Sequence, residues 1–98
     1  MKVSEITNEY IANYLRIDEP GEIETEEIEN FLESAISYCT SYTGLSREEL
    51  DEHEDITTAV LLITSDMFDN RNLYIEGKAS NLNKAVECIL SMHSVNLL

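Results

Sequence analysis

Basic residues are scarce in this chain of 98 residues, which has 6 lysines and arginines against 20 aspartates and glutamates and a formal net charge of -14. Affinity for nucleic acid comes mainly from Lys and Arg side chains that displace counterions from phosphates. With so few cations among so many carboxylates, the chain is expected to repel DNA. Sequence-specific nucleic-acid binding is therefore not a predicted function.

Long apolar runs and targeting signals are also lacking. The longest unbroken apolar run, Ala59 to Ile63, falls far short of the roughly 20 residues that a membrane helix needs. No positively charged segment with an apolar core after it opens the sequence, as it would in a secretory signal peptide. We predict no membrane span, no signal peptide and, by default, a cytoplasmic protein that forms a single domain.

The sequence has two cysteines, Cys39 and Cys88, and both fall in segments with a helical pattern. Without an export signal or closely spaced partners, they are expected to be reduced thiols in or near the core. The sequence contains no CxxC pair and no histidine spacing typical of zinc sites. No metal and no other cofactor is predicted.

The acidic segment Asp51–Asp55, with His53 at its centre, has the residue types of a hard-cation or general-base site. It lacks the alternating ligands and turn glycine of an EF-hand, and the two histidines four residues apart of a metalloprotease helix. A solvated connector that also caps a helix is the favoured interpretation. No catalytic residue is predicted, and His93, expected just beyond the last helix, is interpreted as a surface or contact residue.

Runs of alternating β-branched residues are missing, and the apolar residues recur at helical spacing throughout. Four helices are predicted, the first from about Thr7 to Leu15 and the second from Glu22 to Tyr42 or Thr43. The third is expected over Asp55–Arg71 with Asp55 as its N-cap. The fourth is expected to begin at an Asn81 cap and to end near Met92, with a loop over Asn72–Ser80 before it.

The second helix is predicted most securely, because five glutamates between Glu22 and Glu29 suit the positive end of a helix dipole. Its apolar stripe follows the three-four spacing of a helix and comprises Ile28, Phe31, Leu32, Ala35, Tyr38, Cys39 and Tyr42. Gly44 is expected to provide a left-handed C-terminal cap. Ser46 and Glu49 match a capping box, which predicts a single helical turn.

The third helix is apolar almost all the way round, with Leu61 and Leu62 on the side opposite its main apolar face. Such a helix must be surrounded, either by its own chain or by a neighbouring copy. The predicted fold class is all-α: a small bundle of about four helices with a long central third helix and an apolar C-terminal tail, Val95–Leu98.

Charge is distributed unevenly along the chain. Residues 1–55 carry 16 acidic and 3 basic residues, whereas residues 56–98 carry 4 acidic and 3 basic residues. The acidic half is expected to form the solvated surface, and the nearly neutral half to need a cover. The tyrosine pairs Tyr10–Tyr14 and Tyr38–Tyr42 are predicted to pack in a core or an interface, since no Lys or Arg lies between them as in a base-stacking platform.

Arg71 lies at the predicted C-terminal end of the third helix, where a cation suits the helix dipole and can reach Asp66 or Asp69. A local cap is the simpler interpretation. The alternative is an ion pair between subunits, in which Arg71 reaches the acidic half of a neighbouring copy.

The order and spacing of several segments resemble the small head-tail connector, or adaptor, proteins of tailed bacteriophages and prophages. The segments are Tyr14–Asp18 after a short helix, Ala35–Tyr38 and Tyr42–Gly44 at the end of the second helix, Asp55–Arg71 with its Asp69–Arg71 close, and the apolar C-terminal helix and tail. The likeness spans the whole chain, 1–98, as one helical connector domain.

The resemblance implies a structural protein, not an enzyme, that joins a ring of copies, twelve in the virion, beneath the portal protein after DNA packaging. The ring would dock the next head-completion (stopper) or tail-proximal protein, and the protein would pass from the host bacterial cytoplasm to the virion neck. Contacts with the portal or a neighbouring subunit are expected from Asp66, Asp69, Asn70, Arg71, Met92, His93, Val95, Leu97 and Leu98. Many family members end in a tail with Pro and Arg, whereas this chain ends in Val95–Leu98, so the resemblance does not assign which residues contact the portal.

Two other functions are weighed below the connector. The first is an acidic inhibitor that mimics DNA and occupies a basic cleft, which requires carboxylates at phosphate-like spacing on one surface. The second is the carboxylate-based metal enzyme that would use Asp51–Asp55 and His53. For the connector, the large negative charge is expected to keep free subunits apart at low salt until the portal assembles them.

Overall fold

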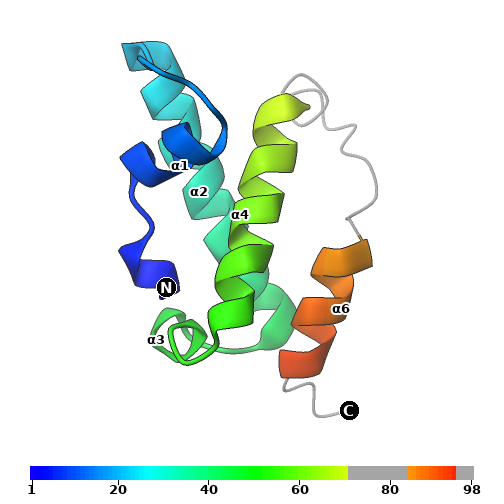
Figure 1. Ribbon diagram of the computed structural model, residues 1–98. Helices are drawn as coiled ribbons and strands as arrows, with labels where there is room; N and C mark the ends of the chain where they lie inside the picture. Colours follow the sequence, from blue (N-terminus) through cyan, green and yellow to red (C-terminus); the bar gives the residue numbers. More distant parts are fainter. Residues whose placement is uncertain (71–83, 95–98) are drawn as a thin grey trace.

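A computed structural model describes residues 1–70 and 84–94 and is helical throughout these ranges, with no strand in them (Figure 1). The elements are η1 (Val3–Glu5), α1 (Asn8–Tyr14), α2 (Glu22–Thr43), α3 (Arg47–Leu50), α4 (Glu54–Asp69) and α6 (Lys84–His93). The predicted class, a small all-α bundle, is confirmed. No helix in the described part of the chain has the length and apolarity needed to cross a bilayer.

The centre of the bundle is the pair formed by α2 and α4, which pack against each other along their length. Figure 1 shows α1 on one side of this pair and α6 on the other. The single 3-10 turn η1 packs on α4, and α6 contacts both α4 and α2. The helix predicted as third, α4, therefore lies at the centre as expected, although α2 is longer, at 22 residues against 16.

The hydrogen bonds that end α1 determine the backbone conformation of the Tyr14–Asp18 segment. The amide of Ile17 donates to the carbonyl of Ala12 (2.8 Å), and that of Arg16 donates to the carbonyl of Asn13 (3.1 Å). This is the Schellman pattern, in which the residue after the C-cap usually is glycine because it must adopt a left-handed conformation. Arg16 holds that conformation here, with φ 63°, at a steric cost to a residue with a Cβ.

The junction between α2 and α3 follows the sequence prediction. Gly44 forms the left-handed cap of α2, with φ 77°. The buried hydroxyl of Thr43 donates to the Cys39 carbonyl (2.7 Å) and accepts from the Leu45 amide (3.2 Å). Ser46 and Glu49 then form the capping box that begins the single turn of α3 (Ser46 N to Glu49 Oε1 2.9 Å, Glu49 N to Ser46 Oγ 3.2 Å).

The prediction of Asp55 as the N-cap of α4 is wrong. The helix begins at Glu54 with His53 in the cap position, and Asp55 lies within its first turn. The Asp55 carboxylate is bound by the ring of His93 (2.7 Å), a partner that local sequence cannot reveal. The helix ends at Asp69 with Asn70 as its C-cap, whereas Arg71 lies outside the described residues.

The chain itself covers both apolar sides of α4, so of the two covers that the sequence allowed, its own chain and a neighbouring copy, its own chain supplies the cover. Leu61 is 8% exposed, and Leu62 is partly buried and packs against the core. The cover comes from α2 on one side and from η1 and α6 on others. The α4 residues buried in the core are Ile56, Ala59, Val60, Leu61 and Ile63.

Several predicted features fall outside the described residues. They are the loop over Asn72–Ser80, the Asn81 cap of the last helix, and the apolar tail Val95–Leu98. The last helix itself is confirmed from Lys84 onward, and it extends one residue beyond the predicted end to include His93.

Candidate functional site

Two pairs of half-exposed tyrosines are the main candidates for a contact surface. Tyr10 and Tyr14 are 40% and 44% exposed on α1, and Tyr38 and Tyr42 are 37% and 39% exposed on α2. Each pair has the spacing of four residues that brings side chains together on one helix face. The tyrosines therefore lie at the surface of this chain and not in its core. Of the two predicted locations, core or interface, only an interface is left.

The first surface, which we call the α1 face, comprises Tyr10, Tyr14 and the exposed Arg16, which follows the C-cap Leu15. Tyr10 also lines a hollow with Met1 and Leu61, at the meeting point of η1, α1 and α4. Tyrosine and arginine are the side chains that most often anchor protein interfaces, because each combines a large contact area with a polar group. The α1 face has this composition.

The second surface, the α2–α6 face, comprises Tyr38, Tyr42, Ser91 and Met92. The two tyrosine rings lie 6.0 Å apart. The Ser91 hydroxyl donates to the Glu87 carbonyl (2.6 Å), so its 3.1 Å contact with the Tyr42 hydroxyl is a bond that Tyr42 donates. Met92, the residue after Ser91 on α6, is 70% exposed, so we count its apolar side chain with this surface.

Acidic groups border the α2–α6 face. Partial burial raises the pKa of Tyr38, and the nearby Tyr42, Glu87 and Cys39 side chains raise it further. Cys88 and Met92 line a hollow on the outer side of α6 together with Glu87. Cys88 is an exposed thiol, in contrast to its predicted place near the core, whereas Cys39 is fully buried, and burial raises its pKa to about 12.

The residues predicted as contacts are separated by the fold. At the end of α4, the Asn70 side chain donates to the Asp66 carboxylate (3.0 Å) and carbonyl (3.2 Å), while Asp69 is exposed. Met92 lies on the α2–α6 face, whereas the neighbouring His93 turns inward to Asp55. Arg71, Val95, Leu97 and Leu98 lie outside the described residues, so this set of contacts stays a prediction.

Three carboxylates of the acidic segment 51–55 are bound to different partners and do not converge. Asp51 accepts from the Ser4 amide (2.9 Å), Glu54 lies 3.7 Å from the Met1 amino group, and Asp55 binds His93. The Ser4 bond lowers the pKa of Asp51. In the described ranges, no group of three His, Cys, Asp or Glu residues is arranged to hold a metal ion.

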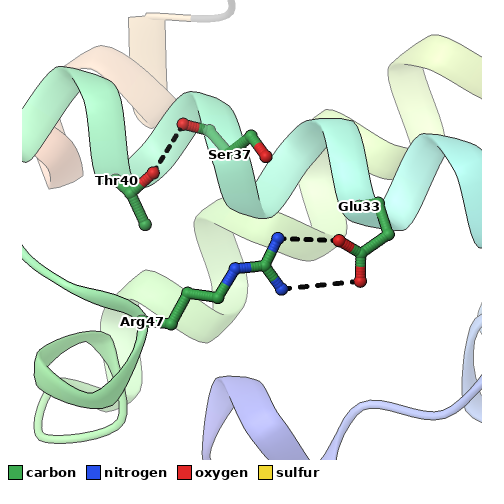
Figure 2. A network of polar contacts seen from close by, with 4 residues as sticks. All are labelled: Glu33, Ser37, Thr40 and Arg47. Atoms are coloured by element: carbon green, nitrogen blue, oxygen red, sulfur yellow. Dashed lines mark hydrogen bonds and ion pairs between the residues drawn. The ribbon is translucent and has the colours of Figure 1, made fainter.

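Arg47 on α3 holds Glu33 on α2 through two parallel contacts, of 2.7 Å and 3.4 Å (Figure 2). The Arg47 guanidinium lowers the pKa of Glu33. Thr40 and Ser37 form a local bond on the same helix, from the Thr40 hydroxyl to the Ser37 carbonyl (2.8 Å). This exposed ion pair joins α3 to α2. Each of the two side chains is the binding partner of the other, so we interpret the pair as structural and not as a ligand site.

Sequence reasoning missed three features of these surfaces. Ile23, in the first turn of α2, is 75% exposed. Its position outside the apolar stripe of that helix could have predicted this exposure. The left-handed conformation of Arg16 and the pairing of His93 with Asp55 had no signal in the local sequence. No family model, curated protein or solved structure matches this chain, so its function must be argued from the residues themselves.

Proposed function

We propose that this protein is a structural head-tail connector of a tailed bacteriophage, which assembles head to tail as a ring of twelve copies beneath the portal protein. The ring would form in the host cytoplasm after DNA packaging and would become part of the virion neck. The next head-completion protein would dock on its far side. The proposal rests on the resemblance of the whole chain to this family and on the two exposed tyrosine faces.

The observation that carries the proposal is a pair of exposed tyrosines on α1 and a second pair on α2, where Tyr42 contacts Ser91 of α6. The helices α1 and α6 lie on opposite sides of the α2–α4 pair (Figure 1). A ring requires a heterologous interface, in which one surface of a subunit meets a different surface of the next. A twofold dimer needs only one self-complementary surface. The α1 face and the α2–α6 face supply two unlike surfaces of the kind that a ring needs.

Charge supports the same proposal in a second way. A conduit for DNA must let the phosphate backbone pass, and a net charge of -14 per copy disfavours the phosphate contacts that would retain it. The same charge makes copies repel each other at low ionic strength, where screening extends over about 30 Å at 0.01 M salt. The portal would overcome this repulsion by holding the subunits in place.

Electron microscopy of this protein mixed with its cognate portal tests the proposal. We expect a ring of added density on the portal with the wild-type chain. The double variant Tyr10→Ala/Tyr14→Ala should bind the portal without closing the ring, because it lacks one of the two faces.

Deletion of residues 95–98 should abolish docking on the portal and leave the helices intact, since the terminal leucines are proposed portal contacts. Portal particles that remain bare with the wild-type chain would contradict the connector role.

One observation favours a second candidate, the acidic inhibitor that mimics DNA. Four exposed glutamates follow one face of α2, namely Glu22, Glu26, Glu29 and Glu33. Carboxylates four residues apart on a helix are separated by about 6 Å along its axis, a spacing comparable to that of phosphates. This candidate predicts tight binding to a DNA-binding protein that weakens steeply with salt, and changing Glu26 and Glu29 to Gln should reduce it.

A further inference from the structure

The C-terminal end of α6 is joined to the start of α4 by three side chains. His93, the last residue of α6, places its Nε2 atom 2.8 Å and 2.7 Å from the two carboxylate oxygens of Asp55, in the first turn of α4. The ring of His53, the N-cap of α4, lies against the His93 ring, with centroids 4.1 Å apart and planes inclined by 35°. Two titratable rings and one carboxylate thus form a single cluster, in which Asp55 and His93 are 38 positions apart in the sequence.

The charge state of this cluster decides whether its contacts attract or repel. One protonated ring beside the Asp55 carboxylate gives an ion pair, and a cation at the end of α6 and an anion at the start of α4 also suit both helix dipoles. A second proton would put two positive rings in contact, where like charges repel. Histidine is the side chain whose charge can change near neutral pH, so the contacts of this cluster can respond to acid.

We propose that His53, Asp55 and His93 form an acid-sensitive latch, which holds α6 on α4 while the two rings share one proton and releases it when they take up a second. Because α6 carries Ser91 and Met92, the latch also controls whether the α2–α6 face is complete. The latch is a property of the single chain. Its use in assembly rests on the proposed connector function.

The surroundings of the cluster leave Asp55 as its main counterion. Glu54 on α4 is directed to the Met1 amino group, and Glu49 on α3 is tied to Ser46 but also feels the charge of His53. From α2, Tyr42 contacts α6 at Ser91, two residues before His93. Glu87 on α6 lies near Tyr38.

The Asp55 carboxyl limits the latch at the acid end. Burial raises its pKa, but the hydrogen bond and charge of His93 and the charge of His53 outweigh burial, and the pKa falls below its ordinary value. A carboxyl with a lowered pKa in the folded state stabilises that state above the ordinary value of about 3.9, and the contribution is lost as the pH falls through the lowered value. Protonation of Asp55 therefore removes the counterion of the two rings as the pH falls through that lowered value.

Amide hydrogen exchange on the full chain tests the latch. Between pH 7.5 and pH 5, after correction for intrinsic exchange, we expect the protection of α6 amides near Val86 and Leu90 to fall by about tenfold, the equivalent of one pKa unit. Protection in α4 near Ala59 and Ile63 should stay constant. An equal loss in both helices, or no loss in α6, would overturn the latch.

Two variants and a control sharpen the measurement. His53→Phe keeps a flat ring beside His93 but cannot take the second proton, so α6 should remain protected at pH 5. His93→Gln removes the ion pair, so α6 should be less protected at pH 7.5 and insensitive to pH below it. Glu54→Gln, which changes a neighbouring carboxylate outside the latch, should behave as the wild type. A pH profile in His53→Phe identical to the wild-type profile would refute the role of the second proton.

A titration of the unaltered protein covers the case in which a variant does not fold. The ring protons of His53 and His93, followed by NMR, should titrate in two separated steps that both rings report, as expected of coupled groups. Two independent single-step curves would overturn the latch. Because none of these experiments involves a portal or a second copy, failure of the connector proposal would leave their outcome unchanged.

Discussion

The helices α4 and α6 are both apolar in sequence, but they are held in different ways. Seven of the 16 residues of α4 are buried, whereas α6 buries Val86 and Leu90 among its 10 described residues. Full burial of a large aliphatic side chain contributes about 1.5–3 kcal/mol, so α4 is fixed by the core. The attachment of α6 depends much more on a few contacts, namely Tyr42 with Ser91 and Asp55 with His93. From this difference we expect residues 1–70 to form a stable body to which α6 is attached conditionally.

Truncation of Ile56 should produce the largest effect. Ile56 is fully buried at the start of α4, and replacement of such a residue by alanine costs about 2–5 kcal/mol, partly through the cavity left behind. Because α4 contacts η1, α2 and α6, Ile56→Ala should destabilise the entire body. Urea unfolding followed by circular dichroism measures this, and a loss below about 1 kcal/mol would place Ile56 outside the core.

Truncation of Leu90 gives the matched comparison, since Leu90 is equally buried but lies on α6. The intrinsic cost of Leu90→Ala is also about 2–5 kcal/mol. If α6 is attached conditionally, the cost should be confined to α6, whose amides become unprotected while those of the body remain protected. Hydrogen exchange of the two helices separates the cases. A global destabilisation equal to that of Ile56→Ala would show that α6 belongs to the same cooperative unit.

Replacement of Arg16 should change the body alone, and in the opposite direction. Arg16 occupies a left-handed position at the end of α1, where a residue with a Cβ costs about 1–2 kcal/mol relative to glycine. Arg16→Gly should therefore stabilise the body by about 1 kcal/mol, less the added freedom of glycine in the unfolded chain. The free energy of α6 opening should not change. A lower free energy of unfolding would mean that the Arg16 side chain stabilises the fold.

The hydroxyl of Tyr42 should have the smallest effect. Its loss in Tyr42→Phe removes the bond to Ser91, worth about 0.5–1.5 kcal/mol in general and less at an exposed site such as this. The protection of α6 amides should fall two- to fivefold, which corresponds to a loss of about 0.5–1 kcal/mol in the free energy of α6 opening. The protection of α4 amides should not change. Tyr38→Phe removes the hydroxyl of the neighbouring tyrosine, which does not take part in that bond, and should leave α6 unaffected. Equal effects of the two substitutions would exclude the Tyr42–Ser91 bond as an attachment point.

Features set by neighbouring residues could be predicted from the sequence. Gly44 and the Ser46–Glu49 capping box depend only on local backbone geometry and on side chains three residues apart. The helical class followed from apolar spacing. These signals fixed the elements but not how the elements cover one another.

Features that depend on distant residues could not be predicted. Asp55 matched an N-cap in sequence, but its partner is His93, 38 positions away. Leu61 and Leu62 suggested a side of α4 that needs a cover, and α4 packs against η1 and α6 as well as α2. Tyr10 and Tyr14 fit the apolar stripe of α1 but lie at the surface, because a helix of seven residues has room for one narrow buried face.

Mixing two incomplete variants tests most directly whether the two tyrosine faces join copies head to tail. One variant, Tyr10→Ala/Tyr14→Ala, lacks the α1 face; the other, Tyr38→Ser/Met92→Ser, lacks the apolar part of the α2–α6 face. In 1 M salt, where screening shortens to about 3 Å, sedimentation should show oligomers of the wild-type chain and monomers of each variant alone. An equimolar mixture should give dimers and nothing larger, because each pair keeps one matching contact. Wild-type chain that stays monomeric at this salt, or a mixture that contains only monomers while the wild type assembles, would contradict the head-to-tail interface.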